Sequence, residues 1–359
     1  MLYREAGQFK SSYGADEAIF PIRQDRWLFA AALIVAYVVV PLIASEYWLL
    51  SILIPFLVFS LAAIGLNILT GYAGQVSLGT GGFMAVGAFA TYKLATSFPD
   101  LNIVVVFILA GLITAMVGVL FGWPSLRIKG FYLAVATLAA QFFLIWMFNK
   151  FPWFNNYTPS GVISAPPRAV FGHVFVTGAE ANSVDKYLFV LSAVTLLALA
   201  AKNLVRGRVG REWMAIRDMD IAAEIIGIRP LKTKLLAFAI SSFYCGIAGA
   251  MWAFIYTGGV EALAFDIDRS FQILFMIIIG GLGSILGSFL GAAFIVLLPL
   301  LLERTPMALG FDVPVNYLSN MQSMIFGALI IFFLIVEPRG LARLWQIGKE
   351  KLRMWPFPY

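Results

Sequence analysis

The feature that most constrains this chain is a series of apolar runs, each long enough to cross a bilayer. In a helix that rises 1.5 Å per residue, roughly 20 apolar residues span the hydrocarbon core. We expect about ten such segments, and their approximate bounds are 27–45, 48–70, 74–96, 101–122, 131–149, 186–201, 235–257, 270–282, 285–302 and 319–336. The pattern predicts an all-α polytopic membrane protein.

The composition supports this class. Of the 359 residues, 61% are hydrophobic and 12% are charged, whereas a soluble domain carries about 25% charged residues. The first apolar run lacks a small-residue cleavage pattern, so we expect it to be retained as a helix. A single cysteine, Cys245, excludes an internal disulfide, and a single histidine, His173, excludes a histidine cluster.

The distribution of basic residues predicts the orientation. Ten crossings put both termini on one side, together with the segments 123–130 and 202–234. That side holds 19 of the 25 lysines and arginines but only 10 of the 19 acidic residues. By the positive-inside rule it is cytoplasmic. We therefore expect a cytoplasmic segment 1–26, a transmembrane domain 27–336 with a coupling loop near 202–234 and an external cap loop near 150–185, and a cytoplasmic tail 337–359. No continuous basic surface indicates nucleic-acid binding.

The third apolar segment has an unusual composition. Its sequence, GLNILTGYAGQVSLGTGGFMAVGAFA over 65–90, places glycines between polar residues. Irregular backbone at membrane depth persists only where protein or a water-filled cavity satisfies it. One interpretation is a broken helix that lines a translocation path; the other is tight helix packing. The path interpretation assigns hydrogen-bonding roles to Asn67, Gln75, Ser77 and Thr80.

A second glycine-rich stretch, GGLGSILGSFLGAAF over 280–294, spaces Gly283, Gly287 and Gly291 four residues apart. This spacing predicts a ladder on one helix face that permits close helix packing. The two glycine-rich segments lie about 200 residues apart, each near the start of a helix. We therefore expect a 5+5 inverted repeat, with a broken third helix.

The stretch IRDMDIAAEIIGIRP over 216–230 is highly charged for this chain. Apolar residues at four helix-spaced positions predict a short helix, with Asp218 as its N-cap and a stop at Gly227 and Pro230. Docking into a groove on a soluble partner and lying flat on lipid are both open. We favour the partner, because two alanines bury little area in lipid. The predicted coupling residues are Arg211, Arg217, Met219, Ala222, Ala223, Glu224, Ile226 and Gly227.

Motifs for bond chemistry do not occur. The sequence has no phosphate-binding loop, nucleophile elbow, zinc motif or paired intramembrane carboxylates, so we expect no enzyme activity, no bound cofactor and no metal. Ion-coupled carriers place ionisable groups at mid-membrane. Lys93 is the nearest exception, and snorkelling to the interface explains it better. A partner-independent channel or carrier is therefore the weaker alternative.

Three blocks of sequence resemble the LivM-type permease subunit of bacterial ABC importers for branched-chain amino acids. They are GLNILTGYAGQVSLG, the coupling stretch with the helix after it, and ILFMIIIGGLGSILGSFLGAAF with EPRGL at 337–341. The resemblance implies an inner-membrane subunit. Its partners would be a second, LivH-like permease, two cytoplasmic ATPases that bind ATP and Mg, and a periplasmic binding protein.

The sequence also departs from the family pattern. The coupling pattern E-A-A-x-x-x-G places Ile221 where the family's general form has an acidic residue. Thr80, Gly81 and Gly82 replace a frequent His-Ala-Ala run, and the external loop retains only part of a Thr-Gly-Gly run. Members of the family also import urea, short amides and aromatic acids. The resemblance thus implies a branched-chain or other hydrophobic amino acid as the first expectation for the solute, with those classes as alternatives.

Overall fold

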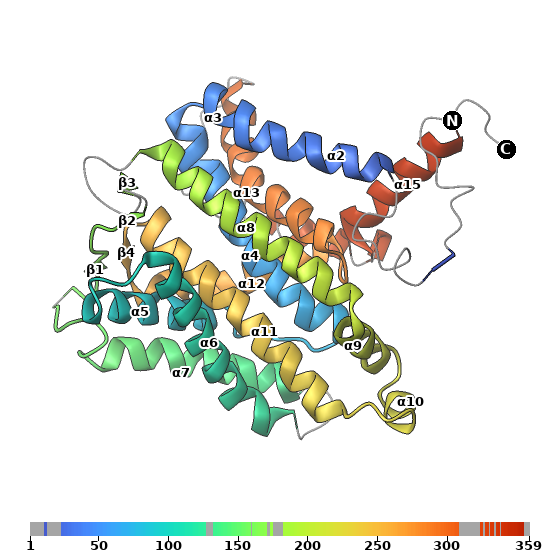
Figure 1. Ribbon diagram of the computed structural model, residues 1–359, viewed down its shortest axis with the longest axis horizontal. Helices are drawn as coiled ribbons and strands as arrows, with labels where there is room; N and C mark the ends of the chain where they lie inside the picture. The colour runs from blue at the N-terminus through green and yellow to red at the C-terminus, as the bar shows by residue number, and fades with distance from the viewer. Residues whose placement is uncertain are drawn as a thin grey trace.

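Helices make up nearly all of the described chain (Figure 1). The computed structural model describes residues 11–12, 23–126, 132–158, 160–170, 173–174 and 182–308, together with 324–325, 327–329, 331–333, 335–337 and 339–354. The α-helices are α2 (Arg23–Ile34), α3 (Val40–Ile43), α4 (Ile54–Asn67), α5 (Thr80–Ser97), α6 (Ile103–Ser125), α7 (Tyr132–Lys150), α8 (Ser183–Arg206), α9 (Arg208–Asp218), α10 (Asp220–Ile225), α11 (Pro230–Met251), α12 (Ile267–Gly280), α13 (Ile285–Ala308) and α15 (Gly340–Met354).

Several α-helices are extended at one end by a π-helical turn. These turns are Val35–Val39, Trp48–Leu53, Ile68–Tyr72 and Trp252–Tyr256, and a 3₁₀ turn spans Ala262–Phe265. Seven helical stretches among the described residues are long and apolar enough to cross a membrane: Gln24–Ile43, Trp48–Tyr72, Ile103–Ser125, Tyr132–Lys150, Ser183–Arg206, Pro230–Tyr256 and Ile285–Leu302. The all-α polytopic class is thereby supported. The expected count of ten is not established, because α5 and α12 fall short of that criterion and the segment near 319–336 lies largely outside the described residues.

The short strands lie at one end of the bundle, and α9, α10 and α15 lie at the other (Figure 1). Strand β1 (Ile163–Ser164) pairs antiparallel with β4 (Gly259–Val260), and β2 (Ala169–Val170) pairs with β3 (His173–Val174). Arg168 donates to the carbonyl oxygens of Pro99 and Ala95 at the end of α5. The described part of the loop near 150–185 is thus anchored to the bundle.

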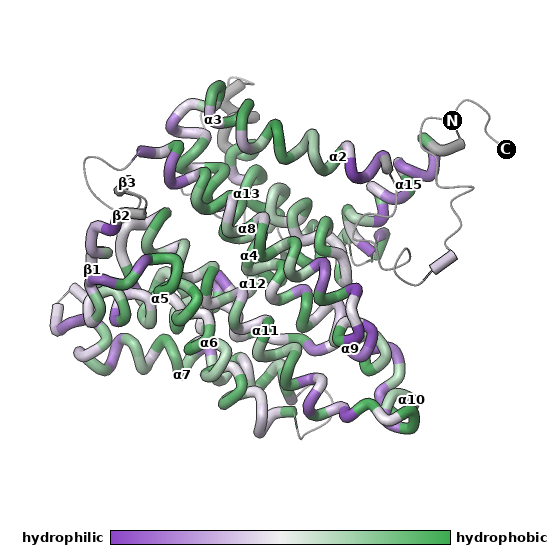
Figure 2. The backbone as a smooth tube through the Cα atoms, viewed as in Figure 1, coloured by the Kyte–Doolittle hydropathy of each residue, from purple (hydrophilic) through white to green (hydrophobic). Residues whose placement is uncertain are grey.

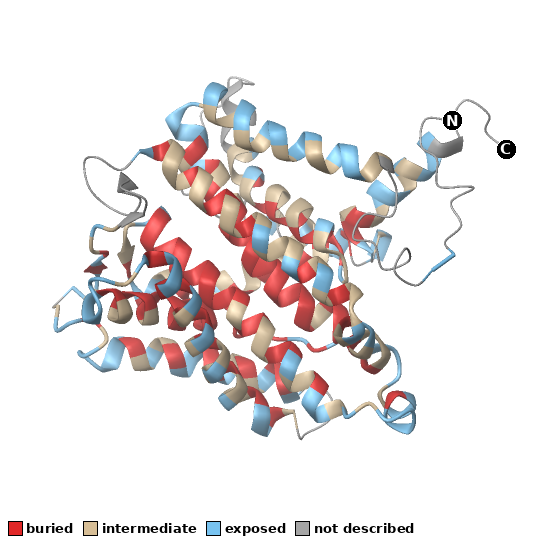
Figure 3. Cartoon of the chain, viewed as in Figure 1, coloured by how far each residue is buried: buried red, intermediate tan, exposed pale blue. Residues whose placement is uncertain are grey.

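The helices at the centre are α4 and α11. In their spans 78% and 72% of the most apolar window is buried, whereas the span that contains α2 has none, and Figure 3 shows the same contrast. At the opposite end from the strands, Lys349 Nζ of α15 lies 2.9 Å from Asp25 Oδ1 of α2. The first and last described helices therefore meet on the side of α9 and α10.

Glycines let α5 and α11 approach closely. A Cβ on Gly87 would overlap the backbone of Gly246, and a Cβ on Gly249 would overlap the backbone of Met84. Small residues at helix contacts commonly serve this purpose in membranes. The glycine-rich composition of the third segment thus contributes to packing, and packing and an irregular connection occur together in it.

We expect Gly87→Ala to lower the free energy of unfolding by about 2–3 kcal/mol, because the new methyl group pushes α5 away from α11. Unfolding in mixed micelles, followed by circular dichroism, measures this. The control is Gly348→Ala in α15, where nothing lies within 4 Å of the added Cβ; there the better helix propensity should stabilise by up to about 1 kcal/mol. Equal effects of the two changes would contradict the close-packing account.

Candidate functional site

The stretch 65–90 contains an irregular connection between two helices, and α5 itself is unbroken, so the expected break within the third helix is not found. The helix that contains α4 ends with the π turn at Tyr72, residues 73–79 are not helical, and α5 begins at Thr80. Gly74 has φ +70°, a left-handed conformation that favours glycine. The carbonyl and amide groups released here need other partners: Gln75 N–H donates to the Leu69 carbonyl at 3.0 Å, and Leu78 N–H to Thr137 Oγ1 at 2.9 Å.

A similar arrangement follows α11. Its π turn ends at Tyr256, residues 257–266 contain only β4 and the 3₁₀ turn, and α12 begins at Ile267. In both places a central helix ends in a π turn, the chain becomes irregular, and a shorter helix begins. The C-terminal ends of these two shorter helices point in opposite directions: α5 ends beside Arg168 of the strand-side loop, whereas α12 ends beside α4 and Arg217 of α9.

The N-termini of α5 and α12 meet inside the bundle. Gly81 N–H donates to Ser270 Oγ at 2.8 Å, and Gly82 N–H donates to Gln141 Oε1 of α7. Ser270 Oγ donates to the same Gln141 oxygen at 3.0 Å, and Gln141 Nε2 donates to the Phe265 carbonyl at 2.8 Å. Because Gln141 is the tenth of the 19 residues of α7, the meeting point lies about halfway along that helix.

The sequence analysis missed Gln141. The signal was a single amide inside the apolar run 131–149, where a polar side chain needs a hydrogen-bonding partner. Nothing in the sequence shows that its partners are the start of α5 and the start of α12, because these lie about 60 and 125 residues away along the chain.

Among the predicted path residues, Gln75 and Thr80 differ from the other two. Both side chains are buried, and neither the amide of Gln75 nor the hydroxyl of Thr80 has a hydrogen-bond partner among the described residues. Ser77 Oγ accepts from Gly79 N–H at 3.4 Å. Buried polar groups are rarely left without partners. Gln75 and Thr80 are therefore the predicted path residues whose side chains can still form hydrogen bonds.

Asn67 is fully engaged within the protein. Its Nδ2 donates to the Ser284 carbonyl and to Ser288 Oγ, both at 2.9 Å, and its Oδ1 accepts from Gly283 N–H at 2.8 Å. It therefore ties α4 to the connection between α12 and α13. In this structure both of its polar atoms are bonded to protein, so neither is left for a solute.

The glycine ladder is only partly helical. Gly287 and Gly291 lie in α13, where a Cβ on either would overlap the backbone of α12. Gly283 precedes α13 and has φ +73°. The prediction that it shares a helix face with the other two is therefore wrong: Gly283 lies in the turn between α12 and α13, where its left-handed φ suits glycine.

The charged stretch forms two helices, α9 and α10, at the end opposite the strands. The N-cap of α10 is Met219, so the assignment of Asp218 as its cap is wrong; Asp218 instead pairs with Arg217 at 2.9 Å. Gly227 follows α10 with φ +91° and nothing near an added Cβ. Its role in this structure is thus to reverse the chain after the helix.

The surface of α10 is apolar. Met219, Ile221, Ile225 and Ile226 are all exposed, by 64% or more. Ala222 and Glu224 are exposed as well, whereas Ala223 is buried within the chain. The large apolar side chains and Ala222 thus form the accessible part, and Ala223 does not. Figure 2 shows this hydrophobic tip next to the hydrophilic α9.

Arg217 connects α9 to the irregular segment after α4. Its Nη1 donates to the carbonyl of Gly71 at 2.9 Å, and its side chain lies against Gly74 and Gly283. Arg211 is directed elsewhere and donates to the Arg206 carbonyl at 3.2 Å. Met219, which precedes α10, is therefore two residues from Arg217. Arg217 in turn contacts the irregular segment after α4 and the turn between α12 and α13.

Arg269 is an ionisable residue inside the bundle that was not predicted from the sequence, and its guanidinium lies 4.5 Å from the ring of Trp252, near the end of the span Pro230–Tyr256. Its guanidinium lies 5.0 Å from the ring of Phe59, which is halfway along the span Trp48–Tyr72. The sequence predicted that the eighth apolar segment begins near residue 270, at the outer end of a helix. The structure instead carries residues 257–266 inward as irregular chain, so α12 begins at depth.

Metal chemistry has no visible basis in the part of the chain that the structure describes, since no cluster of three or more His, Cys, Asp or Glu side chains occurs there. The polar groups at the two irregular connections are amides, hydroxyls and arginines. Such groups bind and orient a solute and do not activate a water or a nucleophile.

Comparison with known families identifies the class. The model of the family described as branched-chain amino acid transport system / permease component matches residues 48–334. The chain belongs to this family. The match includes both irregular connections, α9 and α10, whereas EPRGL at 337–341 lies beyond it. The family assignment agrees with the resemblance to LivM-type permeases noted from the sequence.

Two of the curated relatives are similar over most of their lengths, and a third over a shorter part. The high-affinity branched-chain amino acid transport system permease protein LivM of Salmonella typhimurium is 29% identical over 333 residues, which cover 88% of this chain and 74% of the relative. The Escherichia coli protein of the same name gives the same values. The autoinducer 2 import system permease protein LsrC of an Enterobacter species is 28% identical over 109 residues, or 29% of this chain. No solved structure gives a significant match.

Proposed function

We propose that this LivM-type permease is one of two membrane subunits of an ATP-driven importer. The second would be a LivH-like permease, and two cytoplasmic ATPase subunits would bind ATP and Mg and hydrolyse the nucleotide. A periplasmic binding protein would deliver the solute. The chain itself would lie in the inner membrane with both termini in the cytoplasm and would catalyse no bond chemistry.

The observation that carries this proposal is the exposed apolar tip of α10. Four large apolar side chains project into solvent on a helix that lies beyond the apolar spans. An exposed hydrophobic surface on a short helix suits a groove on a soluble protein. The alternative is that α10 lies on lipid. The link from Arg217 to Gly71 favours docking, because it gives a movement of α9 and α10 a direct route to the irregular segment after α4.

We propose that the path runs beside the two irregular connections. Gln75 and Thr80 have buried polar groups without partners, which a passing solute could satisfy, and Ser77 lies between them. The paired features of α5 and α12 further support a 5+5 inverted repeat. In such an arrangement, movement of one half against the other exposes the site to alternate sides of the membrane.

The solute proposed first is a branched-chain or other hydrophobic amino acid. The LivM relatives are named for branched-chain amino acid transport, and a more distant relative is named for import of autoinducer 2. Urea, short amides and aromatic acids are the alternatives within the same class of importer.

The test is reconstitution with and without the partners. We expect proteoliposomes that contain both permeases and both ATPases to take up L-leucine only when ATP and the binding protein are present. Vesicles with this chain alone, or with the ATPases omitted, should not accumulate solute. Sustained accumulation by the chain alone would show that it is an independent channel or carrier and would refute the proposal.

A further inference from the structure

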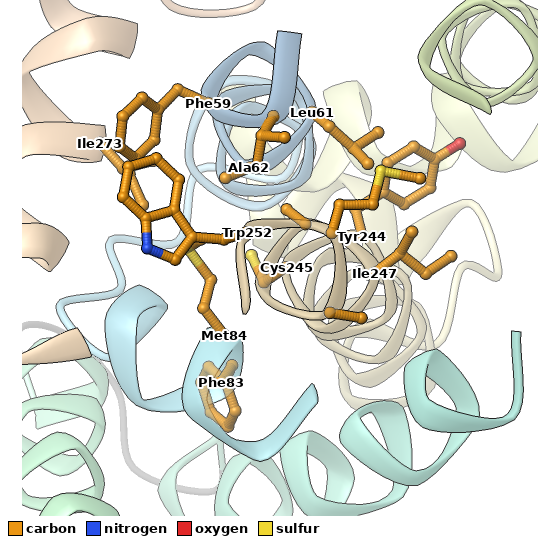
Figure 4. Packing of buried hydrophobic residues seen from close by; sticks show 14 of the residues in the cluster. Phe59, Leu61, Ala62, Phe83, Met84, Tyr244, Cys245, Ile247, Trp252 and Ile273 are labelled. Atoms are coloured by element: carbon orange, nitrogen blue, oxygen red, sulfur yellow. The ribbon is translucent and has the colours of Figure 1, made fainter. Parts of the chain in front are cut away.

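Arg269 is a cation inside the bundle that packs against two neighbouring aromatic rings. Its Cζ lies 4.5 Å from the ring centroid of Trp252 and 5.0 Å from that of Phe59, two rings that lie side by side in Figure 4. Its Nε donates to the Ala264 carbonyl at 3.3 Å and its Nη1 to Gln272 Oε1 at 2.8 Å. Arg269 as a whole is half-buried.

No acidic side chain forms an ion pair with Arg269 among the residues that the structure describes. Asp266, three residues earlier, uses Oδ1 to accept from the backbone N–H groups of Asp268 and Arg269, which caps α12. A charged side chain at membrane depth is costly, and such residues usually face a partner or a pathway. Arg269 thus has aromatic and neutral contacts and forms no ion pair within the described chain, while the Asp266 carboxylate attracts it from beyond ion-pair distance.

Two further buried donors belong to residues close to α12: Trp252 contacts Arg269 through its ring, and Thr80 precedes Gly81, which bonds to Ser270. The indole N–H of Trp252 and the hydroxyl of Thr80 are both more than nine-tenths buried and have no hydrogen-bond partner within the described chain. Thr80 opens α5, and Met84, one turn later, lies beside the indole of Trp252 in Figure 4. The N-termini of α5 and α12 meet here through Gly81 and Ser270, and helix N-termini favour negative charge.

We propose that Arg269 binds the carboxylate of the transported solute, with the Trp252 indole and the Thr80 hydroxyl as additional donors. This inference rests on the proposed importer function and narrows it: the solute is an acid, such as an amino acid or an aromatic acid, whereas urea and short amides are excluded. A guanidinium, an indole N–H and a hydroxyl suit an acceptor with two oxygens. The solute carboxylate would form the direct ion pair that the described residues do not provide.

The experiment uses the complete importer in nanodiscs without its binding protein. Carboxylate probes are L-leucine and benzoate at millimolar concentration, and neutral probes are urea and acetamide. A ligand that binds only the folded state raises the melting temperature. We expect the two carboxylates to raise it and the neutral probes to leave it unchanged. Arg269→Gln should abolish the rise, and Trp252→Phe, which keeps the ring but loses the donor, should reduce it.

The matched control is Lys93→Gln. Lys93 is also a cation over an aromatic ring, 4.4 Å from that of Trp153, but near the strand-side end of α5. Neutralising it should preserve the carboxylate response. In proteoliposomes with the binding protein and ATP, Arg269→Gln should lower L-leucine uptake by about 10- to 100-fold, as expected for a lost charge-assisted hydrogen bond, and Arg269→Lys should restore part of it.

The outcomes separate the two proposals. If the wild-type importer takes up none of the probes with ATP and binding protein present, the importer function fails. If it does take up solute but Arg269→Gln keeps the wild-type uptake and melting response, the carboxylate site is refuted. Stabilisation by urea or acetamide without stabilisation by carboxylates would refute it too. If Arg269 has only a structural role, Arg269→Gln and Arg269→Lys should lower the melting temperature equally. In both variants the carboxylate probes should then still raise the melting temperature as in the wild type.

Discussion

Replacing Arg217 with glutamine is expected to lower ATP-driven uptake by about 5- to 150-fold, the range that corresponds to a coupling free energy of 1–3 kcal/mol. Its Nη1 donates to the Gly71 carbonyl at 2.9 Å, and its side chain lies against Gly74. The change removes the direct contact between α9 and the irregular segment after α4. We therefore expect ATP hydrolysis to continue while transport falls, so that the number of solute molecules moved per ATP decreases.

Uptake and phosphate release in the same proteoliposomes measure this ratio. The control is Arg208→Gln on the same helix. Arg208 is exposed and pairs with Glu212 at 3.0 Å, a surface pair that contributes little, so its loss should leave the ratio unchanged. Equal ratios in Arg217→Gln and wild type would show that α9 does not transmit the movement. A loss of both activities with poor membrane insertion would instead give Arg217 a role in folding only.

Replacing Asn67 with leucine is expected to lower the free energy of unfolding by about 2–4 kcal/mol, because hydrogen bonds to α13 and its connection are lost and buried backbone groups lose their partner. The amide bonds Gly283 N–H, the Ser284 carbonyl and Ser288 Oγ across more than 200 residues of sequence. Leucine has a similar size, so the loss is one of hydrogen bonds rather than of volume.

Chemical unfolding of the purified chain in mixed micelles measures the effect. Ser60→Ala provides the control on the same helix, since Ser60 is equally buried but donates only to the Phe56 carbonyl of its own α4. We expect a change of less than about 1 kcal/mol there, because no contact between helices is lost. If Asn67→Leu is as mild as Ser60→Ala, then Asn67 does not hold the connection between α12 and α13.

The local pattern of apolar and polar residues was sufficient to predict much of the fold. The long apolar runs at 48–70, 101–122 and 235–257 predicted spans that the structure contains, because a run of about 20 apolar residues has few other stable solutions. The irregular backbone near Gly74 was predictable from the mixture of glycines and polar residues. The short helix α10 was predictable from its periodicity, although its start and its accessible face were not.

The contacts of the candidate functional residues were harder to predict from the sequence. Arg217 was predicted for its charge and its position in the loop, but nothing local indicates that it reaches Gly71. Asn67 was predicted as a path residue because it is polar in an apolar run; the same property suits the packing role that the structure shows. Ala223 was predicted as part of the contact surface, and the structure buries it because α10 turns its isoleucines outward.

By itself the sequence determined the class of protein, the approximate spans and the family resemblance, because these depend on local hydropathy and on motifs within short windows. The tertiary structure alone decided the depth of each polar group. Arg269 is the third residue of α12, and it lies inside the bundle because irregular chain carries the start of α12 inward. Depth in a bundle depends on the path of the backbone in space, which a linear count of apolar residues does not contain.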